Sequence, residues 1–379
     1  MNKTYVEDHA SLVVLCQKLA QADFLAIDTE FVRTRTLYPK LGLIQVNDGE
    51  NLALIDPVAI DDLSPFWQLL TDEKICKVLH ACSEDLEVFL TAANCRPVNL
   101  IDSQIMMSFL GHGLSMGYAA MVNHYLDIEV DKSESRTDWM KRPLSAKQLD
   151  YAQADVEYLF QLYPRIRDEL EQKGWLDAAQ EESDLLIEKK FTPIDESKLY
   201  RNIKLSWKLS AKQLYILQHL ASWRFQQAKS RDMPIGFIAK DHTLFALAVH
   251  NPDNVAVMAN LEGVEMLDVR HKGKTMLMVL KKAEQEDCGQ YPEKIFRLDE
   301  YPGYKQIFKK VKNFVAEQAL NAELTPENLA SKKQINQFLS WHFKLHNAPE
   351  YSESIDILSG WRKTLFGEQL NLFAKNDFK

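Results

Sequence analysis

Two carboxylates interrupt an otherwise apolar stretch near the start of the chain, at residues 24–31. The stretch predicts a buried strand, and because side chains two apart on a strand share a face, Asp28 and Glu30 would lie together. Two such carboxylates repel each other and lose hydration unless a cation neutralises them. Oxygen ligands of this kind suit a hard divalent ion such as Mg²⁺ or Mn²⁺. The alternative for this stretch alone is a strand that runs out into solvent.

Two further acidic sites could complete such a metal cluster. Asp85 follows a strand pattern and falls in the first turn of a predicted helix. The alternative for this residue alone is an acid that interacts favourably with the helix dipole. Tyr151 and Asp155 are four residues apart on a predicted helix and therefore share one face. The alternative for this pair is a half-buried tyrosine beside a solvated aspartate.

The elements around these residues predict an α/β domain. Apolar runs indicate strands at 24–31, 41–46, 52–55, 75–79 and 98–101, and helical spacing indicates helices at 8–19, 63–70, 84–92, 103–109 and 116–125. Asn47-Asp48-Gly49 is a hairpin turn signal. Ser145 and Gln148 have capping-box spacing at the start of a helix that continues to about residue 172. We expect a mixed sheet flanked by helices.

The rear of the chain is helical in period, with no convincing strand pattern after residue 203. It contains a weak internal repeat, in which Ser222-Trp223-Arg224-Phe225 resembles Ser340-Trp341-His342-Phe343. The repeat favours two related helical modules, with coincidence as the alternative. A long polar stretch at 127–143 predicts a functional loop.

Taken together, the acidic residues form a specific set. Asp-x-Glu on an early strand, an Asp opening a later helix and Tyr-x-x-x-Asp on a late helix resemble the DEDDy subgroup of 3′–5′ exonucleases, whose domain has a ribonuclease H-like fold. The matching stretches are 24–31, 41–46, 80–85 and 151–155. Residues 209–224 resemble a first HRDC domain, and 334–341 with Trp361 and Arg362 resemble a second. The whole chain therefore resembles the ribonuclease D branch of that family.

The resemblance divides the chain into four segments. We expect a DEDDy 3′–5′ exonuclease domain at 1–172, a connector at 173–203, a first all-α HRDC-like domain at 204–290 and a second at 291–376.

The resemblance also implies a mechanism with two divalent ions, Mg²⁺ or Mn²⁺, as the cofactors. Asp28, Glu30 and Asp155 would hold the ion that activates the attacking water. Asp28 would bridge to the second ion, which Asp85 would assist. Tyr151 would orient the water, because an ordinary tyrosine pKa of about 10 makes it a poor base at neutral pH.

Several other residues are weaker candidates for substrate binding. Gln45, His80 and Gln104 match family patterns, with core hydrogen bonding as an equal alternative. Arg136 lies in the long polar loop and is a candidate for phosphate contact, with a solvated charge as the alternative. Three basic residues of the first helical module suit phosphate contact. They are Arg224, Lys229 and Arg231.

The charge of the chain is unevenly spread. The net charge of −9 divides into −11 for residues 1–170, −3 for 171–203 and +5 for 204–379. This asymmetry suggests chemistry in the front half and binding of a polyanion in the rear half. The chain shows neither a signal peptide pattern nor an apolar run of the roughly 18 residues needed to span a membrane.

The five cysteines, Cys16, Cys76, Cys82, Cys95 and Cys288, are odd in number and lack a Cys-x-x-Cys pair. They favour neither a disulfide framework nor a zinc site, so we expect a cytoplasmic protein. By the resemblance it would be a monomer without a small-molecule cofactor or membrane partner. It would release 5′-mononucleotides from RNA, with tRNA precursors as substrates. The alternatives are a DNA 3′–5′ exonuclease and a non-catalytic nucleic-acid-binding protein.

Overall fold

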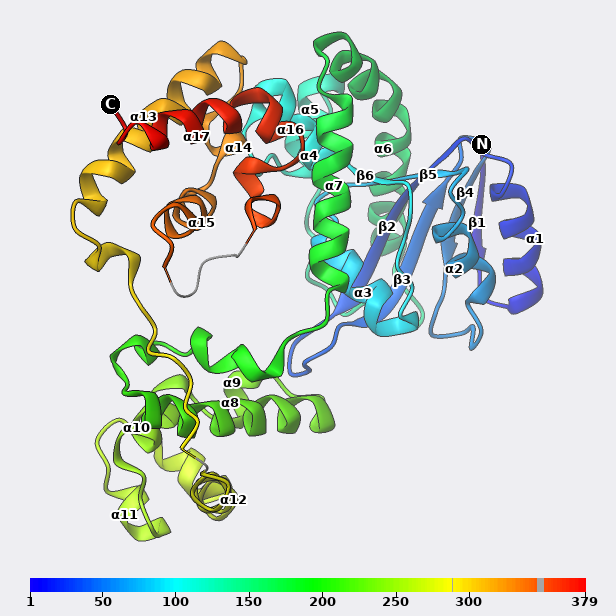
Figure 1. The fold of residues 1–379 in the computed structure, drawn as a ribbon. Coiled ribbons are helices and arrows are strands. Elements are labelled where there is room, and N and C mark those ends of the chain that lie inside the picture. The colour runs from blue at the N-terminus through cyan, green and yellow to red at the C-terminus, as the bar shows by residue number, and fades with distance from the viewer. Residues whose placement is uncertain (288, 346–350) are drawn as a thin grey trace.

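The structure, a computed structural model, describes residues 1–287, 289–345 and 351–379. Cys288 lies outside the described residues. Figure 1 shows an α/β region followed by two helical regions, of which the second lies beside the α/β region and the first lies apart from the second. The predicted class, an α/β domain followed by all-α domains, is confirmed.

One six-stranded mixed sheet forms the centre of the α/β region, with strand order β1-β4-β3-β2-β5-β6. The strands are β1 (Asn2–Val6), β2 (Phe24–Val32), β3 (Lys40–Asn47), β4 (Asn51–Ile55), β5 (Cys76–Leu79) and β6 (Leu100–Asp102). β3 is antiparallel to both β2 and β4, and its pairing with β4 is the one that the hairpin signal predicts. β2, β5 and β6 run parallel, so their carboxyl ends meet at one edge of the sheet.

Helices cover both faces of this sheet (Figure 1). The helices of the region are α1 (His9–Leu19), α2 (Ser64–Leu70), α3 (Ser83–Ala93), α4 (Ser103–Met107), α5 (Tyr118–Leu126), α6 (Ala146–Lys173) and α7 (Leu176–Phe191). Leu25 and Ile27 of β2 pack in the core formed with α1, α2 and α3. Ala26 lies in the opposite core, with α6. Side-chain alternation thus places Asp28 and Glu30 on the face that α6 covers.

Two features differ from the sequence-based expectation. β1 was not predicted; it pairs in parallel with β4, and of its five residues only Val6 is buried, so it lacks the alternation that marks a strand. The expected connector at 173–203 is helical over α7. That helix packs on the sheet, where the Ser183 hydroxyl accepts a hydrogen bond from the backbone N–H of Asp102.

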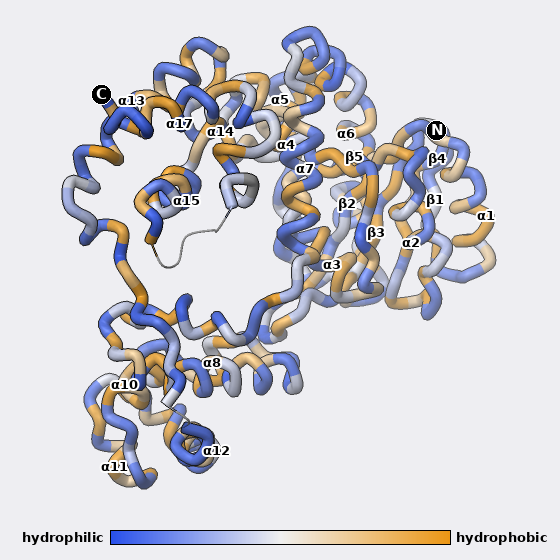
Figure 2. Tube along the Cα trace, viewed as in Figure 1, coloured by the Kyte–Doolittle hydropathy of each residue, from blue (hydrophilic) through white to orange (hydrophobic). Residues whose placement is uncertain are grey.

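The first helical region has a core of its own. Its helices are α8 (Ala211–Arg231), α9 (Ile235–Ile238), α10 (Asp241–His250), α11 (Val255–Ala259) and α12 (Met266–Gln285). The second region contains α13 (Tyr304–Asn321), α14 (Pro326–Leu329), α15 (Lys332–His342), α16 (Gly360–Arg362) and α17 (Glu368–Lys375). Hydrophilic and hydrophobic residues alternate along helices such as α13 (Figure 2), as expected of helices with one buried face.

The two helical regions are attached to the α/β region differently. The second shares a continuous apolar core with it, which includes Val156 of α6 and Phe366. The first touches it at the loop after β2, where the Asp232 carboxylate accepts hydrogen bonds from the backbone N–H groups of Leu37 and Tyr38, both at 3.0 Å.

Candidate metal centre

Three carboxylates converge at the carboxyl end of β2. Asp28 and Glu30 come from β2 and Asp155 comes from α6, and one ligand oxygen of each lies within 4.8 Å of the others. The convergence follows from local structure, because β2 presents both acids to the face on which α6 packs. Glu30 and Asp155 are buried and Asp28 is half-buried.

Asp85 is a further buried carboxylate at this edge of the sheet. It lies in the first turn of α3, and the Thr29 hydroxyl donates a hydrogen bond to it. Of the neighbouring charges that raise the pKa of Asp28, Asp85 contributes most, ahead of Asp155. All four acids of the predicted set therefore lie in one electrostatically connected cluster.

Burial and mutual repulsion make this cluster unfavourable without a cation. Burial, followed by the charges of the other carboxylates, holds the pKa of Asp28 well above its usual range and raises the pKa of Glu30 to about 9. Burial also raises the pKa of Asp155 to about 7 and that of Asp85 to about 6. Oxygen Oδ2 of Asp155 is buried with no hydrogen-bond partner among the described residues. This donor set fits a hard divalent cation, which needs carboxylate oxygens and would offset their repulsion.

Tyr151 lies one helical turn before Asp155 on α6 and is half-buried. Burial, and after it the charge of Asp155, raises the pKa of the Tyr151 hydroxyl above its ordinary value of 10. The neighbouring Tyr151 hydroxyl lowers the pKa of Asp155, which opposes the larger effect of burial. The hydroxyl therefore keeps its proton at neutral pH, which suits orientation rather than proton removal.

Comparison with known proteins agrees with this fold. Residues 4–171 match the 3′-5′ exonuclease family, residues 213–280 match the HRDC domain, and residues 302–370 match the C-terminal HRDC domain of ribonuclease D. The chain is 44% identical over 376 residues to ribonuclease D of Musicola paradisiaca, which covers 99% of this chain and 100% of that relative. The chain belongs to the ribonuclease D family.

Other members of the ribonuclease D family support the same assignment. Ribonuclease D of Escherichia coli K12 is 41% identical over 374 residues, or 98% of both chains. The crystal structure of E. coli RNase D, described as "an exoribonuclease involved in structured RNA processing", has a TM-score of 0.92 at 40% identity and covers 99% of both chains. The chain is thus a 3′–5′ exoribonuclease, a hydrolase that acts on RNA. Among the described residues, no helix is long and apolar enough to cross a membrane.

Gln45, predicted as a substrate contact of this ribonuclease D, is enclosed in the protein. It pairs with Asp28 across β2 and β3, so the two side chains emerge on the same face of the sheet. Its side chain is 0% exposed, and neither its amide oxygen nor its amide nitrogen has a hydrogen-bond partner among the described residues. Direct contact with RNA does not fit this burial.

His80 and Gln104 lie at the same edge of the sheet as the metal ligands. His80 directly follows β5, and Gln104 lies in the first turn of α4, after β6. Both side chains hydrogen-bond the backbone carbonyl of Met116. The sequence placed both residues near the centre but could not indicate this shared partner.

The predicted basic contacts differ in their exposure and in their ion pairs. Arg136 and Arg231 are exposed. Arg224 donates to the Ala239 carbonyl and to Asp241 and keeps only 11% of its side chain exposed, which indicates a structural ion pair. The Lys229 ammonium lies 3.5 Å from a Glu196 carboxylate oxygen.

Sequence reasoning missed two residues that contact the cluster or its ligands. Thr29, between the two acids of β2, hydrogen-bonds Asp85 from the opposite face. Tyr118 donates its hydroxyl hydrogen to the Ala154 carbonyl, next to Asp155 in sequence, at 2.8 Å. The position of Thr29 inside the Asp-x-Glu motif was the available signal for the first, whereas nothing in the local pattern marks Tyr118.

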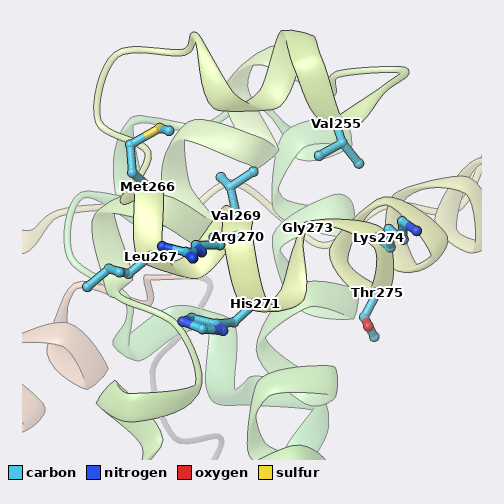
Figure 3. A pocket seen from close by; sticks show the side chains of 9 residues that line it. All are labelled: Val255, Met266, Leu267, Val269, Arg270, His271, Gly273, Lys274 and Thr275. Atoms are coloured by element: carbon cyan, nitrogen blue, oxygen red, sulfur yellow. The ribbon is translucent and has the colours of Figure 1, made fainter.

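A pocket of about 640 Å³ lies in the first helical region, at α11 and α12 (Figure 3). Apolar and basic side chains line it, among them Met266, Leu267 and Arg270. None of its nine lining residues is a carboxylate, so it is chemically unlike the acidic centre on β2.

Proposed function

We propose that this ribonuclease D releases 5′-mononucleotides from RNA 3′ ends at the acidic cluster on β2. In this proposal Asp28, Glu30, Asp85 and Asp155 hold two divalent ions, Mg²⁺ or Mn²⁺. The observation that carries it is the convergence of three carboxylates within 4.8 Å at a buried site, where their repulsion requires a cation. When bound, such ions stabilise the charge that develops on the attacking and leaving oxygens of phosphodiester cleavage.

The chain's own groups have separate tasks. We assign the bridging role to Asp28, because, besides burial, the charges of Asp85, Asp155 and Glu30 all raise its pKa. Tyr151 keeps its hydroxyl proton and orients the attacking water by hydrogen bonding. The burial of the cluster excludes bulk water, which strengthens each charge interaction at the reacting phosphate.

The substrates that we propose are tRNA precursors with 3′ extensions. The family resemblance implies them, and the E. coli relative is described as acting in structured RNA processing. The net charge of +5 over residues 204–379 supports binding of a folded RNA body by the rear half while its 3′ end is cleaved in the acidic front half. We also propose that the protein acts as a cytoplasmic monomer.

The test is degradation of a 5′-labelled tRNA with a 3′ extension, beside a DNA strand matched to the extension. With Mg²⁺ or Mn²⁺ we expect stepwise shortening of the RNA and release of 5′-mononucleotides, and a chelator should stop both. Asp28→Ala should lower the rate by at least about 10³-fold, since loss of a metal ligand removes an electrostatic contribution of several kcal/mol. Asp23→Asn is the matched control, because Asp23 is an exposed acid just before β2.

Each part of the proposal has its own contrary result. Intact RNA in the presence of metal, or an Asp28→Ala variant as fast as the wild type, would overturn the assignment of the centre. Faster digestion of the DNA would favour the DNA exonuclease alternative. Equal rates on the tRNA and on an unstructured RNA would remove the preference for tRNA precursors.

A further inference from the structure

The edge of the sheet that carries the metal ligands also carries a clamp on one loop. β2, β5 and β6 are parallel, so residues that follow their carboxyl ends lie along one edge. Asp28 and Glu30 occupy the end of β2, His80 follows β5, and Gln104 lies two residues after β6. Ligands of α/β sheets bind outside the carboxyl ends of parallel strands, so this edge is where RNA must reach the metal ligands.

The clamp closes on one backbone carbonyl. The Met116 carbonyl oxygen lies 3.1 Å from Nε2 of His80 and accepts a hydrogen bond from Nε2 of Gln104 at 3.0 Å. A carbonyl can only accept, so Nε2 of His80 is the donor to Met116, and Nδ1 of the same ring lies 2.9 Å from the Ser103 hydroxyl, which itself donates to the Leu79 carbonyl. The side chains of His80 and Gln104 therefore both hold the loop through the Met116 carbonyl.

The clamped loop spans residues 113–117, between a π-helical turn, Ser108–His112, and α5. Its next residue, Tyr118, packs edge-on against the His80 ring at 5.6 Å between centroids. The Tyr118 hydroxyl donates to the Ala154 carbonyl on α6, and burial, followed by the charges of Asp155 and Asp28, raises the pKa of this tyrosine. The loop is thus anchored at both the sheet edge and the helix that supplies Asp155.

The loop itself presents apolar surface to solvent. The Leu114 side chain is 50% exposed, Met116 is half-buried and Ser115 is exposed. Gly113 has a φ of +78°, which a residue with a side chain rarely adopts, so the turn that presents Leu114 has a defined shape. An exposed leucine on a loop anchored at two sides is suited to contact with the flat face of a nucleobase, which tolerates any sequence.

We propose that residues 113–117 form a platform for the bases at the 3′ end of the RNA, with Leu114 as the contact. His80 and Gln104 are positioning residues that act through the Met116 carbonyl and do not touch the RNA. This inference rests on the proposed metal centre, which fixes where the 3′ end must lie. It replaces direct substrate contact as the role of His80 and Gln104.

The test is a double-mutant cycle with Leu114→Ala, Gln104→Met and the double variant, all as full-length protein. KM and kcat are measured on a short single-stranded RNA. Each single variant should raise KM about tenfold, within the range for loss of one base contact, and should change kcat less than about twofold. The double variant should raise KM no further than the single variants, because both substitutions remove the same contact.

Controls distinguish loss of the base contact from misfolding and from loss of metal binding. Leu372→Ala removes a comparably exposed leucine of α17 and should leave KM unchanged. Every variant should keep the wild-type shift of Tm on adding Mn²⁺, which reports the metal ligands alone. If Gln104→Met does not fold, Leu114→Ala still decides whether the platform exists, because Leu114 is exposed.

The contrary outcomes are distinct. A wild type that does not shorten RNA would contradict the proposed function. An active wild type with an unchanged KM in Leu114→Ala would overturn the platform. If the two increases in KM multiplied in the double variant, Gln104 would contact RNA directly, and its positioning role would be overturned.

Discussion

At the scale of single residues, the four proposed metal ligands lie in surroundings that oppose their charge. Asp28 shares a buried corner with three other carboxylates, and the pKa values of all four are raised. Such an arrangement lowers the stability of the metal-free fold, because several charges are desolvated and repel one another. The same repulsion gives the site its affinity for a divalent cation.

Because burial and repulsion disfavour the charges of this cluster, we predict that Asp28→Asn stabilises the metal-free protein while it inactivates the enzyme. In a chelator, loss of one charge should raise Tm by about 2–4 °C, which corresponds to about 1 kcal/mol in a domain of this size. Added Mn²⁺ should raise the Tm of the wild type and not that of the variant. Scanning calorimetry with and without metal measures both effects, with Asp23→Asn as the control. If the variant were less stable than the wild type in chelator, the claim that carboxylate repulsion destabilises the metal-free fold would be contradicted.

His80 predicts a pH dependence of stability. Burial lowers its pKa below the ordinary 6.5, with the charge of Asp102 opposing this. Below about pH 6.5 the unfolded chain therefore binds a proton that the folded protein resists, so this residue makes the fold less stable as the pH falls. Between pH 7.5 and 5.5, the Tm of His80→Gln should fall less steeply than that of the wild type. His9→Gln is the control, and equal slopes for His80→Gln and the wild type would contradict the prediction.

Residue types and spacing predicted which face each acid occupies, but not how deep a side chain lies. The alternation of β2 placed Asp28 and Glu30 together, and the structure agrees. Gln45 was a candidate for substrate contact, with core hydrogen bonding as an equal alternative, and it is enclosed in the protein. The strand period specifies which face a side chain occupies, whereas tertiary packing decides how deeply that face is covered. Asp85 joined the set through the family resemblance, since the local pattern also fits a simple helix start.

At the scale of elements, α6 is the part that completes the site, since it carries both Tyr151 and Asp155. Its first turn is held by the capping box, in which the Ser145 hydroxyl accepts from the Gln148 N–H at 3.1 Å and the Gln148 side chain accepts from the Ser145 N–H at 3.0 Å. The same motif begins α8 at Ser210, far along the chain from the metal centre.

Ser145→Ala and Ser210→Ala therefore form a matched pair. Each removes an N-cap and should lower stability by about 1 kcal/mol. Only Ser145→Ala should also lower kcat, because it loosens the turn before Tyr151. Thermal melts and kinetics on one RNA measure both quantities. An equal effect of the two variants on kcat would show that the cap does not support the active site.

Most elements could be predicted from sequence because their cores are periodic. β2, β3 and β4 were found within one residue at each end, as was the capping box of α6. β1 escaped because four of its five residues are exposed and its pairing is with distant β4. α7 was predicted to be part of a connector because its sequence lacks a strong apolar stripe. Its buried side is defined by contact with β6 and α3, which the sequence does not show.

At the scale of the whole molecule, the two helical regions are held with different strength. Arg362 of the second region has a side chain 7% exposed, and it binds Glu182 of α7 with both terminal nitrogens. Glu182 also accepts from the Trp361 indole at 2.8 Å. The first region is held at the loop after β2 through Asp232.

Glu182→Ala should therefore lower the unfolding free energy by about 3–5 kcal/mol, because it leaves the buried Arg362 charge unpaired. Asp232→Ala should cost about 1 kcal/mol or less, since it removes hydrogen bonds at a half-buried site. Its expected effect is instead faster proteolysis within residues 192–203, which join α7 to the first helical region. Urea unfolding and timed proteolysis test the pair. A large loss of stability in Asp232→Ala would contradict the proposed difference.

The arrangement of the regions could not be predicted from the sequence. The helical modules were predicted from apolar periodicity and the repeat, but periodicity shows only that a face is buried, and not against which partner. The Arg362 and Asp232 contacts join residues about 180 and 195 positions apart in sequence, and no local pattern records them. The proposed domain limits likewise await a test by separate expression of each segment.

The most direct test of the metal centre is the number of Mn²⁺ ions bound, measured by calorimetric titration of the full chain with an RNA whose 3′-terminal linkage is not hydrolysable. Two ions per chain are expected for the wild type and for Asp23→Asn, and fewer for Asp28→Ala, because the bridging ligand serves both positions. Binding of two ions by Asp28→Ala with wild-type affinity, or of none by the wild type, would contradict the assignment of the cluster on β2 as the catalytic metal centre.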